Sequence, residues 1–407
     1  MHRRPALAVL AGALALLAAC SSAATGGDEP PTQTLWTFEE FAWYRWINKV
    51  SMNSTVGPVI VGKTVLYGGT YGYSVTGQET WTSRLALLDA ATGQARWRIE
   101  RAGTWGPMAL HGGVVAIALG DRVIGFDLAS GVQRWDAPVR ARSLTAAGDV
   151  VLVAERETIR ALDVASGAPR WQTRSTTDPV AAGDTALFMD GRTLRAVAAA
   201  DGAARWSLEL PEALAYLQSL QGDHLYALGA ATLGSINVRS RALEWVVPLA
   251  SAPTAGITAA GDTLYFTTQT PAGSYVFHAF DPATQKDRWS RPLDSSAPVA
   301  PIVMGSLVAA AANSSVESLV AFSQSTGAVA WSTSAGSSVP VPPVLEGNVL
   351  YVAGQGPNRV YAFQAATGAV LWSGRLWGWP MGMALTDDGT LLVSADNLTL
   401  YAYRTSP

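Results

Sequence analysis

The sequence has few of the residues from which catalytic and metal sites are usually built. Among its 407 residues, cysteine occurs once and histidine four times. A single cysteine leaves no partner for a disulfide within the chain. His111, His224 and His278 lie far apart, without the spacing of metal ligands, so no zinc site is expected. The chain also lacks a Gly-x-Ser-x-Gly elbow and a glycine-rich phosphate loop, and no catalytic residue of those kinds is predicted.

Charge is also scarce. Charged residues make up 14% of the chain and hydrophobic residues 49%. The 28 Lys and Arg residues are slightly outnumbered by 31 Asp and Glu residues, and the formal net charge is −3. Because there is no basic stripe, we do not expect nucleic acid as a partner. The high apolar content instead suits one large, well-filled β core.

The apolar run at the N-terminus is too short to span a bilayer as a permanent helix. It covers residues 5–17 and follows Arg3 and Arg4, a combination that predicts a secretory signal over residues 1–19. The sequence Leu-Ala-Ala-Cys, ending at Cys20, resembles a bacterial lipobox. That resemblance implies cleavage before Cys20 and lipidation of its thiol and new amino group, which anchors a protein stably to a membrane.

Residues 20–34 are small, polar and rich in Pro and Gly, and we predict a flexible tether. The protein is then exported and anchored by lipid. The expected location is the outer membrane, facing the periplasm, in a cell with two membranes, and the cell surface otherwise. Ser21, which follows the lipidated cysteine, permits outer-membrane sorting.

One stretch, Leu85 to Trp97 (LALLDAATGQARW), recurs along the rest of the chain. Eight copies end in a tryptophan, and these tryptophans follow one another at intervals of 35 to 44 residues. A ninth, Trp46, precedes the first copy in an entry segment. A period of this length indicates a repeat architecture. The tryptophans predicted to pack between neighbouring sheets are Trp46, Trp97, Trp135, Trp171, Trp206, Trp245, Trp289, Trp331 and Trp372.

Within each copy, a short apolar strand leads into Asp-x-x-Thr/Ser-Gly, and the tryptophan lies on the returning strand. The aspartate side chain is expected to accept hydrogen bonds from the amides of the turn, and the glycine to supply a positive φ. The residues predicted to make these turns are Asp89, Gly93, Asp127, Gly131, Asp163, Gly167, Gly202, Gly327 and Gly368.

A second pattern, Gly-x-x-Val/Leu-Tyr or another hydrophobic residue, predicts another hairpin in each unit. Four strands per unit and no helix predict an all-β fold, a single β-propeller over residues 35–405. Eight full units and one composite unit give nine blades, with eight as the near alternative. In the composite blade, an N-terminal strand should join three C-terminal strands and close the ring.

The repeat resembles the pyrroloquinoline quinone (PQQ) type of propeller repeat, whose signature Ala-x-Asp-x-x-Thr-Gly-x-x-x-Trp is matched by Ala161, Asp163, Gly167 and Trp171, with Ser in place of Thr. Together with the lipobox, the chain resembles the BamB family of outer-membrane assembly lipoproteins. This resemblance implies a non-enzymatic, monomeric, membrane-tethered scaffold that binds envelope proteins. A PQQ-dependent quinoprotein dehydrogenase, or an envelope ligand-binding sensor, remains the alternative.

Dehydrogenases of the repeat family hold the quinone over the propeller axis, often with a Ca²⁺ ion and a disulfide between adjacent cysteines. This sequence has no adjacent cysteines, and its paired carboxylates, Asp387 and Asp388, precede a glycine as in a hairpin turn. We therefore expect no bound PQQ, no metal and no catalytic residue.

One surface feature is aromatic. Trp105, Trp377 and Trp379 lie where the chain passes from one unit into the first strand of the next, and such connections meet on one face of a propeller. With Tyr71 and Tyr73 they form a candidate partner-binding face, because Trp and Tyr dominate interface hot spots. Packing of these rings between blades is the other interpretation.

Overall fold

The computed structural model describes residues 34–39, 50–75, 78–211, 214, 216–254, 256–297, 299–314 and 316–405. The elements in these ranges are all strands, and no helix in them is long and apolar enough to cross a membrane. The predicted signal peptide (1–19), Cys20 and Trp46 lie outside the described residues, as does the predicted tether except Thr34, which begins the first strand.

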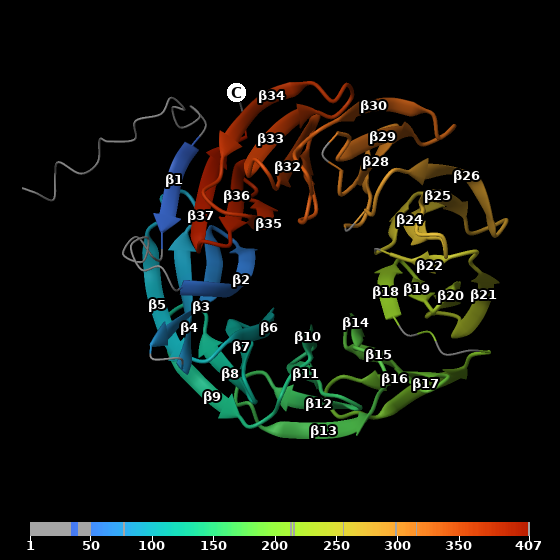
Figure 1. The fold of residues 1–407 in the computed structure, drawn as a ribbon. Helices are drawn as coiled ribbons and strands as arrows, with labels where there is room; N and C mark the ends of the chain where they lie inside the picture. Colours follow the sequence, from blue (N-terminus) through green and yellow to red (C-terminus); the bar gives the residue numbers. More distant parts are fainter. Residues whose placement is uncertain are drawn as a thin grey trace, which may run out of the picture.

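The strands form nine antiparallel sheets arranged in a ring, a β-propeller (Figure 1). The nine sheets confirm the count of nine blades, rather than eight. Blades 1 to 3 consist of β2 (Val50–Val61), β3 (Thr64–Val75), β4 (Gln78–Asp89) and β5 (Ala95–Ala102); β6 (Trp105–His111), β7 (Val114–Leu119), β8 (Arg122–Asp127) and β9 (Gln133–Ala137); and β10 (Ser143–Ala147), β11 (Val150–Ala154), β12 (Thr158–Asp163) and β13 (Pro169–Arg174).

Blades 4 to 6 consist of β14 (Val180–Ala182), β15 (Thr185–Asp190), β16 (Thr193–Ala198) and β17 (Ala204–Glu209); β18 (Tyr216–Gln221), β19 (His224–Leu228), β20 (Thr232–Asn237) and β21 (Ala242–Pro248); and β22 (Ala252–Pro253), β23 (Thr258–Ala260), β24 (Thr263–Gln269), β25 (Tyr275–Asp281) and β26 (Lys286–Leu293). In blade 6 the innermost strand is split, since β22 and β23 both pair with β24.

Blades 7 and 8 consist of β27 (Ile302–Met304), β28 (Leu307–Ala311), β29 (Leu319–Ser323) and β30 (Val329–Thr333); and β31 (Val344–Glu346), β32 (Val349–Gly354), β33 (Arg359–Gln364) and β34 (Val370–Arg375). Blade 9 contains β35 (Pro380–Leu385), β36 (Thr390–Ala395), β37 (Thr399–Arg404) and, on its outer edge, β1 (Thr34–Glu39).

The two ends of the chain therefore meet in one blade. Figure 1 shows β1 beside β37, and their register places Trp36 opposite Ala402. A buried cluster then joins blade 9 to blade 1, with Phe38 and Leu400 on one side and Tyr67 and Leu88 on the other. At the same junction the innermost strands approach closely, because a Cβ at Gly382 would lie 3.0 Å from the Cα of Gly57. The ring is thus closed by the N-terminal strand, as the sequence predicts.

The core is divided among the junctions rather than gathered at one centre. The described residues contain nine hydrophobic clusters, and each is shared by two successive blades. A blade is apolar on both faces, so it is stable only between two neighbours, and closing the ring removes the last two open faces.

Two faces of the ring are distinguished below. The turn face carries the hairpins that join the first to the second strand and the third to the fourth strand of each blade. The connection face carries the hairpins between second and third strands and the links from one blade to the next. Since β1 begins opposite Tyr403, near the end of β37, the chain enters the propeller on the turn face.

Candidate functional site

On the turn face, five of the repeated tryptophans donate a hydrogen bond to the next blade. The indole Nε1 of Trp97 donates to the carbonyl oxygen of Leu128 at 2.8 Å, and that of Trp135 to Val164 at 2.9 Å. Each acceptor is the residue that follows the third strand of the next blade. The same bond recurs from Trp171 to Ala199, from Trp289 to Gln324 and from Trp331 to Ala365.

The turn glycines have a second role that their φ angles alone do not reveal. A Cβ built on Gly167 (φ 69°) would lie 2.6 Å from the ring of Trp135, in the preceding blade. At Gly327 the corresponding distance to Trp289 is 2.5 Å. The indole therefore lies flat against the glycine backbone, and any side chain there would displace it. Gly93, Gly131, Gly202 and Gly368 lie against a tryptophan in the same way.

Two blades lack this glycine, and there the fastening bond is absent too. Arg241 and Gln285 occupy the position with φ values of 59° and 57°. Within the described residues, the indoles of Trp206 and Trp245 make no hydrogen bond to the next blade. Trp206 contacts the blade 4–5 cluster, and Trp245 lies against Phe280, with ring centroids 5.6 Å apart. Trp372 likewise packs on Tyr403 of blade 9.

At the closing junction this position belongs to Trp36. Its Nε1 donates to the carbonyl of Ala90 at 3.1 Å, and a Cβ on Gly93 would lie 2.5 Å from its ring. Trp46 was predicted for this role and lies outside the described residues. Trp36 takes the position of a repeated tryptophan in its sheet. It lies opposite the small residue Ala402 on the third strand of blade 9, as Trp372 lies opposite Ala362 on the third strand of blade 8.

The structure corrects the candidate partner face at two positions. Tyr71 and Trp105 are each only 3% exposed, so neither can present its ring to a partner. Trp105 instead joins blade 1 to blade 2. Its indole donates to the carbonyl of Arg84 at 3.0 Å, and its backbone amide donates to the Ser83 hydroxyl at 2.9 Å. Tyr73 lies on β3, opposite Val50 and Thr80, and its side chain is outside the described residues.

Among the described side chains of that face, Trp377 and Trp379 are exposed, each by 57%, and Met381 beside them is 42% exposed. They occupy the link from β34 to β35 on the connection face. The backbone of this link is fixed, because the amide of Trp377 donates to the Tyr401 hydroxyl at 2.9 Å and that of Trp379 to Asp396 at 2.8 Å. The two indoles are thus held outward on an ordered loop, although burying them in the core would be more favourable.

Two further contacts shape this loop. The guanidinium carbon of Arg375 lies 4.2 Å from the centroid of Trp377, a cation–π contact. At Gly378 a Cβ would lie 2.4 Å from the Asp396 carboxylate, so only glycine fits between the two tryptophans. The Trp377–Trp379 loop therefore presents two exposed indoles on a backbone whose conformation is fixed by these contacts.

The described residues contain no group of three His, Cys, Asp or Glu side chains that could hold a metal ion. Asp387 and Asp388 lie in the turn between β35 and β36, where the Thr386 hydroxyl donates to Asp388. His224 and His278 each pair with a carboxylate of the same blade, Glu244 and Asp287, at 2.8 Å.

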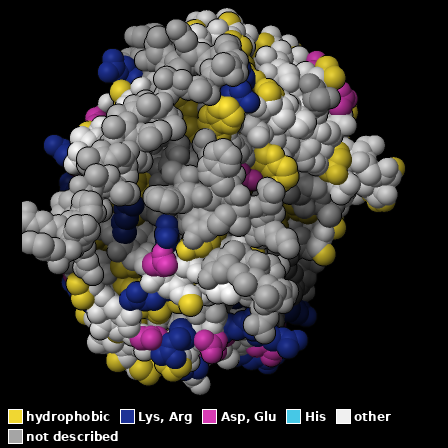
Figure 2. Space-filling model, turned by 60° about the vertical axis from the view of Figure 1, so that its left-hand side comes forward, with side chains coloured by type: hydrophobic (Ala, Val, Ile, Leu, Met, Phe, Trp, Pro, Cys, Tyr) yellow, Lys and Arg dark blue, Asp and Glu magenta, His cyan; other side chains and the backbone are white. Residues whose placement is uncertain are grey.

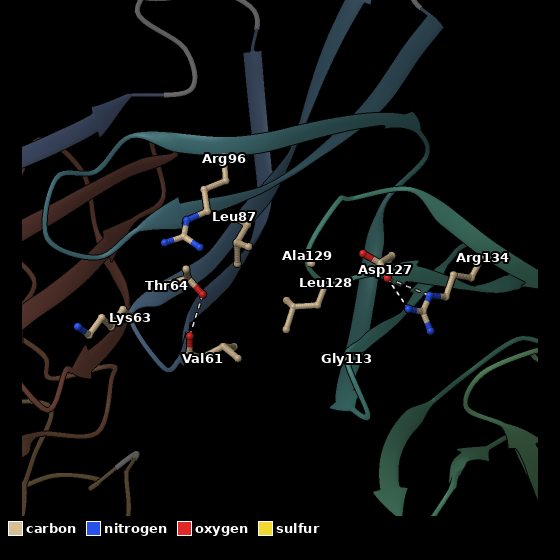
Figure 3. A pocket seen from close by; sticks show the side chains of 10 residues that line it. All are labelled: Val61, Lys63, Thr64, Leu87, Arg96, Gly113, Asp127, Leu128, Ala129 and Arg134. Atoms are coloured by element: carbon tan, nitrogen blue, oxygen red, sulfur yellow. Dashed lines mark hydrogen bonds and ion pairs between the residues drawn. The ribbon is translucent and has the colours of Figure 1, made fainter.

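A groove opens on the turn face between blades 1 and 2, with a volume of about 640 Å³ (Figure 3). Val61, Leu87 and Leu128 supply apolar walls. Lys63 and Arg96 lie on the blade 1 side, and Asp127 and Arg134 on the blade 2 side. The Ser130 hydroxyl and the Arg134 guanidinium donate to Asp127 and lower its pKa to about 2. Sequence reasoning missed this groove, because its residues are distant in the chain.

Comparisons with known proteins agree with this architecture. The model of a family described as outer membrane protein assembly factor BamB matches residues 81–291, 229–340 and 315–406. No curated protein matches the chain. Among solved structures, BamB from Moraxella catarrhalis is 15% identical with a TM-score of 0.50, over 87% of this chain and 99% of that one.

Other propellers are similar to a comparable degree. The designed protein Ika8 is 12% identical with a TM-score of 0.52, over 74% of this chain and 96% of its own. A quinohemoprotein alcohol dehydrogenase from Pseudomonas putida is 11% identical with a TM-score of 0.51, over 88% of this chain and 76% of its own. At such low identity these likenesses show the fold alone.

Proposed function

Because the chain belongs to the family of the outer membrane protein assembly factor BamB, we propose that it is a non-enzymatic β-propeller scaffold that binds a protein partner in the bacterial envelope. In this proposal the propeller is monomeric, works without PQQ, and is held to a membrane by lipid on Cys20. A role in outer-membrane protein assembly follows if the cell has an outer membrane.

The observation that carries the proposal is the Trp377–Trp379 loop. Two indoles, each 57% exposed, lie on a backbone fixed by hydrogen bonds to Tyr401 and Asp396. A partner that covers them gains a large apolar contact, and the loop loses little conformational freedom because it is already ordered. Exposed Met381 extends the same surface.

The test compares the mature wild-type chain with the double variant W377A/W379A as baits for envelope proteins of the native host. Captured proteins are quantified by mass spectrometry. The matched control is V316A, since Val316 is 76% exposed but lies in another blade. We expect the double variant to recover its partner at least about tenfold less, and V316A to recover it like the wild type.

Thermal unfolding distinguishes a lost contact from a lost fold. The removed rings are mostly exposed, so the double variant should unfold within a few degrees of the wild type. Equal recovery by a folded W377A/W379A variant contradicts the proposal. The anchor is tested separately, by mass spectrometry of the N-terminal peptide, which should carry a diacylglyceryl group on Cys20 and lack residues 1–19.

A further inference from the structure

Two positions of the repeat carry opposite charges on the turn face. The first, here called the hairpin position, is the residue after the glycine that joins the first two strands of a blade. Its carbonyl accepts a bond from the amide that follows the third strand, as in Val164 to Asp149 at 3.0 Å and Ala199 to Asp184 at 2.8 Å. The second, the bulge position, is the residue before the repeated tryptophan, where the register of the outer strand shifts.

In blades 3, 4 and 6 these positions form an ion pair within the blade. Arg170 lies 2.7 Å from Asp149, Arg288 lies 2.7 Å from Asp262, and an Arg205 nitrogen donates to Asp184 at 2.7 Å. On the face of the molecule seen in Figure 2, basic and acidic side chains also lie next to one another, near its lower edge. In these three blades the positive charge of the bulge arginine is therefore balanced by the hairpin aspartate of the same blade.

In blades 7 and 8 the arginine is missing, and the aspartate is missing as well. Blade 7 has Ser306 and Ala330, and blade 8 has Asn348 and Leu371. Blade 5 keeps Asp223 but has Glu244 at the bulge position, and there Arg239 lies 3.6 Å from the aspartate. Through these blades, the aspartate is always accompanied by a cation.

In the neighbouring blades 1 and 2, by contrast, the bulge arginine lacks its hairpin aspartate. Both keep the bulge arginine, Arg96 and Arg134. The hairpin position, however, is Lys63 in blade 1 and Gly113 in blade 2, whose carbonyls accept the same bonds from Ala90 at 3.0 Å and Leu128 at 2.9 Å. Compared with blades 3, 4 and 6, a cation thus replaces the hairpin carboxylate in blade 1, and blade 2 has no side chain at that position.

Both departures line the 640 Å³ groove between these blades (Figure 3). The residues that line it include three cations, Lys63, Arg96 and Arg134, and one carboxylate, Asp127. Arg96 lies 3.1 Å from Asp89, and Arg134 pairs with Asp127. Neither arginine has the second carboxylate that Arg170 has in Asp149 together with Asp163. The groove therefore carries a net positive charge beside apolar walls.

We propose that this groove binds an acidic polypeptide segment, whose carboxylates take the places that the hairpin aspartates occupy in blades 3, 4 and 6. Val61, Leu87 and Leu128 accept an aliphatic side chain of the same segment. This combination favours a peptide over a simple anion, because a lone carboxylate leaves the apolar walls uncovered. The site lies on the turn face, so it is distinct from the Trp377–Trp379 loop.

The probe is a fluorescent peptide of alternating Asp and Leu, blocked at both ends, and its binding to the purified mature chain is followed by fluorescence anisotropy. A peptide of alternating Asn and Leu measures apolar binding without charge. We expect the Asp peptide to bind, its affinity to fall as salt rises, and the Asn peptide to bind at least about tenfold more weakly.

The decisive variant is K63D, which restores the residue found in the other blades and gives Arg96 an internal partner. Asp fits this turn elsewhere in the chain, and thermal unfolding checks that K63D is folded. The control K286D makes the same change of charge on the exposed first residue of β26, in blade 6. We expect K63D to weaken the peptide at least about tenfold, and K286D to change it little.

Three results would overturn the proposal. They are equal binding of the Asp peptide by K63D and the wild type, equal losses in K63D and K286D, and equal affinity for the Asp and Asn peptides. Inorganic phosphate that displaces the peptide completely at equal concentration would show attraction of a simple anion only, and would also overturn it. The assay contains no envelope partner, so its failure leaves the Trp377–Trp379 contact untouched.

Discussion

The ring of Trp36 lies flat against the backbone of Gly93, although 57 residues separate them in the chain. A Cβ on Gly93 would lie 2.5 Å from Cε3 of Trp36. The same indole donates to the carbonyl of Ala90 at 3.1 Å. This contact joins the outer strand of blade 9 to the turn of blade 1, and it repeats at the last junction the fastening seen between earlier blades.

Trp36→Ala should loosen the closing strand before the rest of the ring. The indole is partly buried in the blade 9–1 cluster, so we expect a loss of about 2–4 kcal/mol in the free energy of unfolding. Hydrogen exchange should accelerate first at the amides of β1 and β37. The control L35A removes a side chain that is 39% exposed and should cost no more than about 0.5 kcal/mol. Uniform acceleration over all blades would contradict a local opening.

Gly167→Ala tests the close approach of glycine and indole. The substitution introduces a Cβ at φ 69° that would lie 2.6 Å from Trp135, whereas Gly183→Ala does so at φ 62° with no atom within 4 Å. The strained backbone should cost G183A about 1–2 kcal/mol. G167A should cost about 1–3 kcal/mol more, measured by urea unfolding, because the indole must move. Equal losses would mean that the contact with Trp135 is unimportant.

A double-mutant cycle separates the two effects. In W135A/G167A the indole is gone, so the added methyl no longer clashes with it, and the cost of G167A should fall to that of G183A. If G167A lowers the free energy of unfolding equally with and without Trp135, then close packing of the indole on Gly167 is not the reason that glycine is needed there.

Asp163 should make the free energy of unfolding depend on pH in the acidic range. Hydrogen bonds from the Ser166 hydroxyl and the Arg170 guanidinium lower its pKa to about 2, from an ordinary value of 3.8. Because the folded pKa is the lower one, this contribution is complete above about pH 4 and is lost as the pH falls through about 2. We expect D163N to lose less stability than the wild type over that range, in urea unfolding at a series of pH values.

Ser166→Ala tests the same carboxylate through its hydrogen-bond donor. The variant loses the largest cause of the low pKa of Asp163, so its loss of stability in acid should begin at a higher pH than in the wild type. A pH dependence identical in wild type, D163N and S166A would exclude Asp163 as its source.

Pyrroloquinoline quinone should not turn the chain into a dehydrogenase. We expect the mature protein, incubated with PQQ and Ca²⁺ and then desalted, to retain no quinone absorbance and to reduce no artificial dye with alcohols or glucose. Retained quinone with dye reduction would overturn the proposed non-enzymatic role and leave the propeller intact. A quinoprotein dehydrogenase reconstituted in parallel is the positive control.

The period of the tryptophans was sufficient to predict the fold. Eight indoles at intervals of 35 to 44 residues imply eight full blades, and the C-terminal pattern of three strands required a fourth from the N-terminus to make a ninth. The spacing does not reveal Trp36, because β2, β3 and β4 have 12 residues each and lengthen the first unit, so the interval from Trp36 to Trp97 exceeds the period found elsewhere. The prediction for Trp46 falls on a residue outside the described ranges.

The candidate site was less predictable, because burial depends on neighbours that the repeat does not specify. Trp105 and Trp379 occupy similar links between blades, yet one is 3% and the other 57% exposed. The long strands of blade 1 place Ser83 and Arg84 where they accept bonds from Trp105. The charged positions of the turn face were missed for another reason, since Lys63 is unusual only beside Asp149 and Asp184, once their turns are superimposed.

The measurement that tests the proposed function most directly is site-specific photo-crosslinking in the native host. A benzophenone amino acid replaces Trp379 in one strain and Val370 in another. Both side chains are more than half exposed, at 57% and 54%, but Val370 lies at the start of β34, on the turn face. Position 379 should yield one discrete crosslinked envelope protein, and position 370 should not yield that protein. If position 379 yields no crosslink in a chain that is folded and exported, the Trp377–Trp379 loop is not the partner-binding surface.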